Sequence, residues 1–389
     1  MITKFDIMDR AAEWQLRPEI VEKDYVIGWL LTGFSTNSET SSNWIFKGGT
    51  CLKKCYFETY RFSEDLDFSL TPNALYAEQE IKNVLLSLAD HISELSGITF
   101  PTANIVVDSK KNLKEQPTFK AKLAYVGPLQ KSRDPYRILL DLTKHEPVLD
   151  TPDKRRIFHP YPDQLPPGTT IATYSIEEVM AEKMRALFER TRPRDLYDVV
   201  YLLENRIPDI NLHKTRLIFS KKCDSKGFNA PDITHLRERI SKSEELKSEW
   251  SNMLAHQLPQ LPSVDDYLKR IDNLLPIFFA TQKAQSVGVS KSLPLAQGES
   301  VIAQTGIRYW GTGNSLEILR FAATNRLLVT FNYHGKERLA EPYSIHQAKT
   351  GNLLFYGWVL ADNKIKAFKT NEMTNIKATN TSFIPRYSI

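Results

Sequence analysis

The first hundred residues show two different spacings of hydrophobic and polar positions. The stretches Phe5–Trp14 and Pro18–Phe34 repeat their apolar residues with the period of a helix, and Pro18 stands where a helix tolerates proline best. The apolar run Trp44–Phe46 predicts a strand that ends at a pair of glycines, and Leu66–Leu70 alternates as a strand does. The chain therefore begins with helices, and a strand–helix–strand unit follows.

The next part of the pattern continues this alternation of helices and strands. We expect helices at Cys51–Tyr60 and Ala77–Leu95, and extended segments at Ala103–Asp108, Thr118–Val126 and Tyr136–Leu142. Together these segments indicate an α+β domain in which helices back a small mixed sheet.

The remainder of the chain changes character three times. Residues 147–170 are rich in proline and predict irregular structure, whereas Ser175–Ala284 has an almost wholly helical pattern. Residues 285–313 have no sustained apolar period and resemble a linker. The helix expected at Asn314–Asn325 leads into segments typical of strands, Leu327–Tyr333, Leu353–Leu360 and Ile365–Lys369, which suit a small β-barrel.

These changes predict four parts. We expect a catalytic or binding domain at residues 1–205, its helical extension at 206–285, a linker at 286–313 and a barrel domain at 314–389.

Composition narrows the class of protein. The chain has 389 residues, 41% hydrophobic and 25% charged, close to the average for globular proteins. No apolar run reaches the roughly 18 residues of a membrane span, so we expect no membrane association. Three cysteines are too few for a disulfide framework, and we therefore expect a cytoplasmic protein.

The net charge of +5 is unevenly distributed. Residues 1–100 have a net charge of −6, residues 101–290 of +5 and residues 291–389 of +6. An acidic first part followed by basic parts suits carboxylates that bind a metal ion beside a polyanion, although uneven surface charge explains it equally well.

The densest group of candidate functional residues spans residues 46–68. Gly48 and Gly49 lie between a predicted strand and a predicted helix, where backbone N–H groups can approach a phosphate closely. Asp65 and Asp67 stand two apart on a strand, so their carboxylates share one face and could bind Mg²⁺. The alternative is a tight turn and two solvated aspartates, which either motif alone would favour.

Three later residues extend this group. Asp141 is a charge in an otherwise apolar strand, where it needs a partner or a metal ion, or faces water at the strand end. Lys183 emerges from the apolar stripe of a helix and either reaches a triphosphate or extends its ammonium group to the edge of the core. Asp195 follows Pro193 in the first turn of a helix, where the helix dipole alone favours an acid.

Four segments together carry a resemblance to a known family: GGTCLKKCYFETYRFSEDLDFSL, LLDLT, EKMRAL and RPRDLYD. They resemble the AbiEii/AbiGii toxin family of nucleotidyltransferases, which belongs to the DNA polymerase β-like superfamily. The resemblance covers about residues 15–205 and the helices to about residue 285. It implies a polymerase β-like mixed sheet with helices.

The resemblance also implies roles for individual residues. Gly48, Gly49 and Thr50 would hold nucleotide phosphates. Asp65 and Asp67 would bind Mg²⁺, with Mn²⁺ as the alternative, and Asp141 would be the third carboxylate, as metal ligand or base. Lys183 would contact the triphosphate, and Asp195 would orient Lys183 or the acceptor. Family members are typically toxins of toxin–antitoxin or phage-resistance loci, and some transfer nucleotides to tRNA. The implied partners are therefore an NTP, an RNA acceptor and a cognate antitoxin.

A second resemblance concerns the C-terminal part. The segments FAATNR, RLAEP, LFYG and KAF resemble a WYL domain, which has an SH3- or Sm-like β-barrel and binds nucleic acid or nucleotides. Lys366 stands where an arginine is usual in such domains. A barrel that only mediates protein contacts is the alternative.

Three functions are thus open. The first is an Mg²⁺-dependent nucleotidyltransferase toxin that acts on tRNA or other RNA. The second enzyme transfers the nucleotide to a hydroxyl of a protein or small molecule. The third possibility is a regulator without catalysis that senses nucleotides or nucleic acid through the WYL-like domain.

Overall fold

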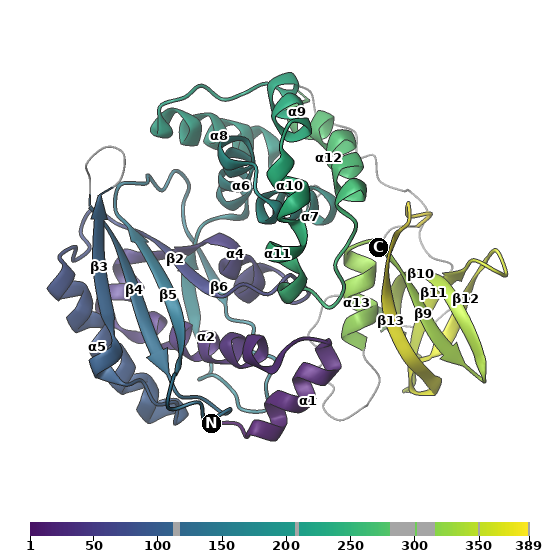
Figure 1. The fold of residues 1–389 in the computed structure, drawn as a ribbon, viewed down its shortest axis with the longest axis horizontal. Helices are drawn as coiled ribbons and strands as arrows, with labels where there is room; N and C mark the ends of the chain where they lie inside the picture. The colour runs from purple at the N-terminus through teal and green to yellow at the C-terminus, as the bar shows by residue number, and fades with distance from the viewer. Residues whose placement is uncertain (112–116, 207–209, 281–299, 302–315, 349–350, 388–389) are drawn as a thin grey trace. The chain divides into compact units, whose positions relative to one another are not determined.

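The computed structural model describes residues 1–111, 117–206, 210–280, 300–301, 316–348 and 351–387, and it divides into two compact units (Figure 1). Unit 1 comprises Met1–Ala12, Leu16–Glu189 and Ile210–Pro231. Unit 2 comprises Glu13–Gln15, Arg190–Asp209 and Asp232–Ile389. The chain therefore passes from unit 1 to unit 2 three times, at residues 13, 190 and 232.

Unit 1 is built on a seven-stranded sheet in the order β3-β4-β5-β2-β1-β7-β6. Its strands are β1 (Trp44–Lys47), β2 (Asp65–Leu70), β3 (Val106–Lys111), β4 (Pro117–Tyr125), β5 (Tyr136–Thr143), β6 (Asp153–Arg156) and β7 (Thr170–Thr173). The central strand β2 pairs antiparallel with β1 and parallel with β5, so the predicted mixed sheet is confirmed.

Unit 1 also contains helices. They are α1 (Lys4–Trp14), α2 (Pro18–Thr36), α3 (Ser38–Asn43), α4 (Gly48–Cys51), α5 (Glu78–Ser96), α6 (Ile176–Arg190) and α8 (Leu212–Lys226). Figure 1 shows α5 and α2 alongside the sheet, and α2 packs on α5, β5 and β7 while α5 packs on β3. Side chains alternate along a strand, so the buried Leu66 and Phe68 face the core while Asp65 and Asp67 face the other side.

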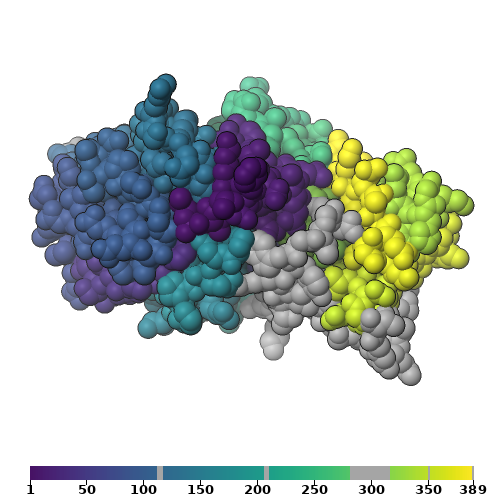
Figure 2. All heavy atoms as spheres, turned by 90° about the horizontal axis from the view of Figure 1, so that it is seen from below, coloured from purple at the N-terminus to yellow at the C-terminus, as the bar shows by residue number. Residues whose placement is uncertain are grey.

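The N-terminal residues are fixed to the surface of unit 1. The hydroxyl of Tyr25 accepts a hydrogen bond from the backbone N–H of Ile2 (3.3 Å) and donates one to Asp163 (2.7 Å). Figure 2 shows the purple N-terminal residues beside teal residues of the segment that follows β6. This contact anchors one end of the segment predicted as irregular.

The structure differs from two predictions in unit 1. The helix expected at Cys51–Tyr60 begins at Gly48 and ends at Tyr56 in a turn of π-helix, Leu52–Tyr56. Residues 147–170 contain the short strand β6, an edge strand of sequence Asp-Lys-Arg-Arg. An edge strand of charged residues has no apolar alternation, so the hydrophobic pattern could not reveal it.

Unit 2 combines a helical group with a second sheet. Its helices are α7 (Pro193–Arg206), α9 (Ile233–Ser241), α10 (Glu244–Ser248), α11 (Trp250–Leu254), α12 (Val264–Phe279) and α13 (Leu316–Thr324). Three of these helices, α7, α12 and α13, are linked through Asn325, which directly follows α13. Its side chain accepts hydrogen bonds from the buried hydroxyls of Tyr197 on α7 (2.7 Å) and Tyr267 on α12 (3.3 Å). The almost wholly helical character predicted for Ser175–Ala284 is confirmed in the described part of that range.

The second sheet is antiparallel, in the order β12-β11-β10-β9-β13, with β8 added to β10. Its strands are β8 (Ser300–Val301), β9 (Leu327–Tyr333), β10 (Lys336–Gln347), β11 (Leu353–Val359), β12 (Lys364–Lys369) and β13 (Met373–Ser382). Three of these strands were expected, whereas β10 and β13 were missed because their polar residues hide the alternation. Within the described residues β12 and β13 are the two edge strands and do not pair with each other, so the structure shows an open sheet where a closed barrel was predicted.

The predicted domain limits differ from the limits of the two compact units. The predicted linker at 286–313 lies almost wholly outside the described residues, and α8 belongs to unit 1 although its residues fall within the predicted helical extension. The ranges 1–205, 206–285 and 314–389 stay a prediction. In the described part of the chain, no helix has the length and apolar character needed to cross a bilayer.

Candidate functional site

A row of charged side chains crosses five strands of the unit 1 sheet. The strand registers pair Lys47 with Asp67, Asp67 with Asp141, Asp141 with Lys120, and Lys120 with Asp108. Directly opposed residues of neighbouring strands point to the same face of a sheet. These five residues, which we name the charged row, therefore place two carboxylates side by side with a lysine on each flank.

Asp65 lies on the same face, one step along β2. It is paired in register with Leu139 of β5, and its backbone carbonyl accepts a hydrogen bond of 2.5 Å from the hydroxyl of Thr50. This bond fastens α4 to the start of β2. Three of the predicted site residues, Asp65, Asp67 and Asp141, are thus gathered on one face beside Thr50.

The environment of Asp67 brings Lys183 into the same group. The pKa of Asp67 is raised to about 6, mostly by burial and also by the negative charges of Asp141 and Asp65, whereas Lys47 and Lys183 oppose this rise. Lys183 is buried on α6. Its ammonium acts electrostatically on Asp67, and its predicted role toward a triphosphate stays a prediction.

The glycine pair lies directly against these carboxylates. Gly48 has φ of +82°, and a Cβ there would collide with Oδ2 of Asp67. A Cβ at Gly49 would lie 2.6 Å from Nη2 of Arg61 and 3.1 Å from Oγ of Ser63. Gly48 is thus required by its positive φ and its close packing on Asp67, whereas a side chain at Gly49 would have to displace the ends of Arg61 and Ser63.

The two lysines of the charged row differ in their surroundings. Lys47 is buried and forms ion pairs with Glu146 and with Glu182, the latter at 3.7 Å. Lys120 lies 2.9 Å from Asp141, and both of these side chains are almost half exposed. One lysine is therefore held within the protein, and the other lies in water.

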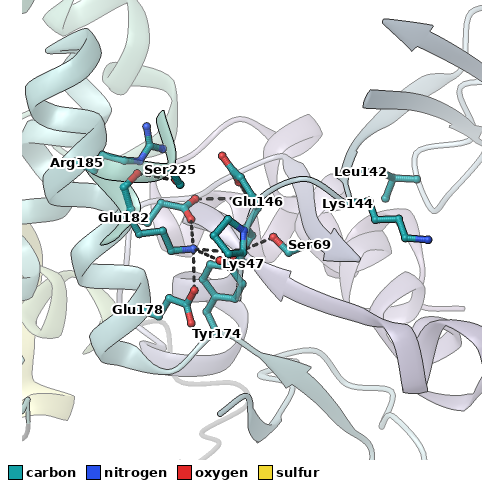
Figure 3. Close-up of polar contacts among 12 residues, drawn as sticks. Lys47, Ser69, Leu142, Lys144, Glu146, Tyr174, Glu178, Glu182, Arg185 and Ser225 are labelled. Atoms are coloured by element: carbon teal, nitrogen blue, oxygen red, sulfur yellow. Dashed lines mark hydrogen bonds and ion pairs between the residues drawn. The ribbon is translucent and has the colours of Figure 1, made fainter. Parts of the chain in front are cut away.

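Lys47 belongs to a larger network of three carboxylates and three ammonium groups, which we name the buried network although its outermost lysine, Lys226, is 35% exposed. Its members are Lys47, Lys222, Lys226, Glu146, Glu178 and Glu182. Figure 3 shows Lys47, Glu146 and Glu182 directed toward one another. Lys222 of α8 lies 2.7 Å from Glu178 and 3.5 Å from Glu182, and Lys226 lies 2.6 Å from Glu146. The buried network thus ties β1, α6 and α8 together beside the glycine turn.

Asp195 lies elsewhere, in unit 2. It is fully buried in the first turn of α7, and its two oxygens accept hydrogen bonds from Arg190 Nε (2.7 Å) and Nη2 (2.9 Å). This paired contact with an arginine is strong and directional. It gives Asp195 a structural partner, and its role toward Lys183 or an acceptor stays a prediction.

The donor groups of the site suit a divalent cation in kind. Carboxylate oxygens are the ligands that Mg²⁺ and Mn²⁺ prefer, and Asp67 has the carboxylates of Asp141 and Asp65 on the same face of the sheet. In the parts of the chain that the structure describes, no three acidic, histidine or cysteine side chains are already gathered as a ligand set. The ion pair with Lys120 holds Asp141 toward β4.

Sequence reasoning missed several residues of this site. Lys47 directly precedes the glycines and could have been found from its place in the motif, whereas Lys120 is close to Asp141 only because of the strand register. Arg61 lies within the segment that carried the family resemblance and packs on Gly49. The glutamates Glu146 and Glu182 gave no signal, because nothing in the sequence shows that they are buried.

Comparisons with known proteins bear on this site. Residues 29–270 match the family described as "Nucleotidyl transferase AbiEii toxin, Type IV TA system". No curated protein matches the chain. The match ends before the second sheet, so the WYL-like assignment stays a prediction.

Solved structures of low sequence identity are also similar in part. MenT4, a nucleotidyltransferase toxin from Mycobacterium tuberculosis H37Rv, has 18% identity and a TM-score of 0.49 over 73% of this chain and 91% of its own. JHP933 from Helicobacter pylori has 16% identity and a TM-score of 0.45 over 68% of this chain and 93% of its own. Likeness of this degree adds no argument to the family match.

The family match covers more than half of the chain, including every aspartate of the site and Lys183, and it confirms the first resemblance. Nucleotidyltransferases of this family use an NTP and a divalent metal ion. The chain belongs to the AbiEii nucleotidyl transferase toxin family of type IV toxin–antitoxin systems and is a nucleotidyltransferase.

Proposed function

We propose that the protein is an Mg²⁺-dependent toxin that transfers a nucleoside monophosphate from an NTP to a hydroxyl of RNA, with tRNA as the favoured acceptor. The observation that carries this proposal is the charged row, in which Asp67 and Asp141 lie side by side with Asp65 one step away. Adjacent like charges destabilise a fold unless a cation compensates them, so their presence points to function.

Asp65, Asp67 and Asp141 would hold the metal ions. Two bound ions of this kind activate an acceptor hydroxyl and stabilise the leaving pyrophosphate when they are present. The protein's own contribution is to keep three carboxylates on one rigid face of a sheet. Asp141, exposed at the side of β4, is the carboxylate with room to serve as metal ligand or as base toward the acceptor.

The triphosphate would lie between the glycine turn and α6. Gly48, Gly49 and Thr50 offer backbone N–H groups and a close approach, because no Cβ stands above the turn at the two glycines. Lys183 supplies a positive charge near the same carboxylates. Arg61, which packs on Gly49, adds a second cation to this side of the site.

An RNA acceptor is supported by the surface beside the aspartates. The strands β4 and β5 and the end of β3 lie within the stretch 110–156, which carries 12 basic and 6 acidic residues. Leu139, in register with Asp65, is 44% exposed, so an apolar surface for a base adjoins the metal ligands. Phosphates of a polynucleotide would follow the basic side chains, and binding would therefore weaken with salt.

The acceptor can be identified directly. The full chain is incubated with each α-³²P-labelled NTP, Mg²⁺ and cell extract, and the product is treated with ribonuclease or with protease. Transfer to RNA predicts label that ribonuclease releases and protease does not. Label released by protease, or found in a small molecule, would show that the acceptor is a hydroxyl of a protein or small molecule and that RNA is not the acceptor. Nucleotide binding without any labelled product would favour the sensing regulator and contradict catalysis.

We extend the proposal to the partners and the C-terminal part. A WYL-like fold for residues 314–389 is supported by α13 followed by an antiparallel sheet, and Lys366 of β12 is paired there with Asp362 at 2.6 Å. We assign to it a nucleotide or nucleic-acid ligand. The proposal also includes a cognate antitoxin as partner. It further includes a cytoplasmic location, which is supported by three buried cysteines that form no disulfide.

A further inference from the structure

The charged row poses a question about charge balance. Asp67 and Asp141 are direct neighbours across β2 and β5, with Lys47 on one flank and Lys120 on the other. Two adjacent carboxylates repel each other strongly in a protein unless cations lie nearby. The two lysines are the cations that the sheet itself places beside them.

Lys47 is fixed in place. Its side chain is only 8% exposed, and it contacts Glu146 and Glu182, which in turn contact Lys226 and Lys222 (Figure 3). Removing this ammonium from its partners would leave buried carboxylates without a counter-charge, which is costly. Lys47 therefore stays where it is, whatever binds to the aspartates.

Lys120 is placed to move. Its ammonium lies 2.9 Å from Asp141, its side chain is 50% exposed, and that of Asp141 is 41% exposed. An exposed pair of this kind contributes little stability, so breaking it costs little.

We propose that Lys120 is an exchangeable counter-ion of Asp141, which neutralises the carboxylate in the metal-free protein and releases it when a divalent cation binds. Lys120 is thus a positioning residue that acts through Asp141. The inference rests on the proposed metal site.

Lys122 offers a matched control on the same strand and the same face. Its ammonium lies 3.2 Å from Asp108, and its side chain is 47% exposed. Its register partner on β5 is Leu139, where Lys120 has Asp141. The two lysines thus share type, strand, exposure and an ion pair, and they differ in whether the partner is a proposed metal ligand.

The test measures the affinity of the full chain for Mn²⁺ in the absence of nucleotide. The concentration of unbound Mn²⁺ is determined from its EPR signal. K120M removes the competing ammonium and should tighten Mn²⁺ binding about two- to five-fold. K120R keeps the pair and should bind as the wild type does, and K122M should also leave the affinity unchanged. D141N should weaken binding, and K120M should bring no gain in a chain that already carries D141N.

The outcomes separate this inference from the metal site itself. A gain in affinity is a result that general structural damage would not produce. If the wild type binds Mn²⁺ and K120M binds it no more tightly than K122M does, the exchange is refuted and the metal site stands. If the wild type binds no Mn²⁺ and D141N behaves identically, the metal site and the exchange are both refuted.

Discussion

The two sheets of the protein differ in whether carboxylates lie directly side by side. In unit 1, Asp67 and Asp141 are direct neighbours of the same sign, beside a buried network of glutamates and lysines. In unit 2, opposite charges pair locally near the surface, as Asp362 does with Lys366 at 2.6 Å and Glu372 with Lys369 at 3.0 Å. Both sheets have an apolar core, so packing does not distinguish them.

The difference indicates where the chemistry lies. Surface pairs of opposite charge are compatible with stability alone, and each contributes little. Adjacent carboxylates that share one face weaken the fold in the absence of a cation, and a fold retains them where binding or catalysis requires it. Substitutions matched between the two sheets can therefore test the comparison.

The largest expected effect is the loss of the central carboxylates. Asp67→Ala or Asp65→Ala should reduce transfer of label from α-³²P NTP by at least about 10³-fold, because metal binding is lost. The thermal unfolding midpoint should not fall, since Asp67→Ala relieves repulsion from Asp141. Asp362→Ala, in the turn between β11 and β12 of unit 2, should leave transfer unchanged. Full activity in either unit 1 variant would remove the site assignment.

The next effect is on stability and concerns the buried network. Lys47→Met should lower the free energy of unfolding by about 3–5 kcal/mol, because Glu146 and Glu182 would lose a buried counter-charge. Urea unfolding measures this change. Lys369→Met, in an exposed pair of unit 2, should show no measurable difference from the wild type. Equal effects of the two substitutions would show that burial does not distinguish these ion pairs.

Lys183 should have a smaller effect, on transfer alone. Lys183→Met should lower kcat/KM for the NTP by about 10²-fold, since a cation beside the carboxylates and the proposed triphosphate is lost. Lys366→Met, in the second sheet, serves as the comparison. An unchanged kcat/KM in the Lys183 variant would show that Lys183 has no role toward the triphosphate. Its ammonium group would then only extend to the edge of the core.

The smallest expected effect is a difference in pH dependence between the units. Burial raises the pKa of Glu22 on α2 to about 7, so its ionisation opposes folding as pH rises from about 4.5 to 7. Hydrogen bonds from Lys369, His334 and Tyr333 lower the pKa of Glu372 to about 2, so its stabilising contribution is lost only as pH falls from about 4.5 toward 2.

Urea unfolding at pH 4.5 and 7.5 tests these opposite signs. Glu22→Gln should be more stable than the wild type at pH 7.5, by on the order of 2 kcal/mol, and nearly equal to it at pH 4.5. The difference between Glu372→Gln and the wild type should change much less between these two pH values. A constant difference for Glu22→Gln would show that its carboxyl is ionised normally in the folded protein.

The sequence predicted much of unit 1 because its signals are local. Strands β2 and β5 have clear alternation, and α2 and α5 have clear helical periods, so the mixed sheet followed from pattern alone. Asp65 and Asp67 were found because two positions on one strand share a face whatever the strand pairs with. The strands β6, β10 and β13 were missed, since charged and polar residues conceal their period.

What the sequence could not predict depends on register and burial. Lys120 contacts Asp141 only because β4 and β5 pair at that register, and no spacing along the chain encodes it. Glu182 stands next to Lys183 in the sequence and gave no sign that it is buried against Lys47. The clasp of Asp195 by Arg190 likewise became visible only in the structure.

The central claim is that the charged row of unit 1 carries out nucleotidyl transfer, and the fate of two labels tests it most directly. Wild-type protein is incubated in parallel with α-³²P NTP and γ-³²P NTP, Mg²⁺ and total cell RNA. The account predicts that the α label becomes covalently attached to RNA, that the γ label appears only in pyrophosphate, and that Asp67→Asn yields neither product. Attachment of the γ label to RNA, or equal α labelling by Asp67→Asn, would contradict it.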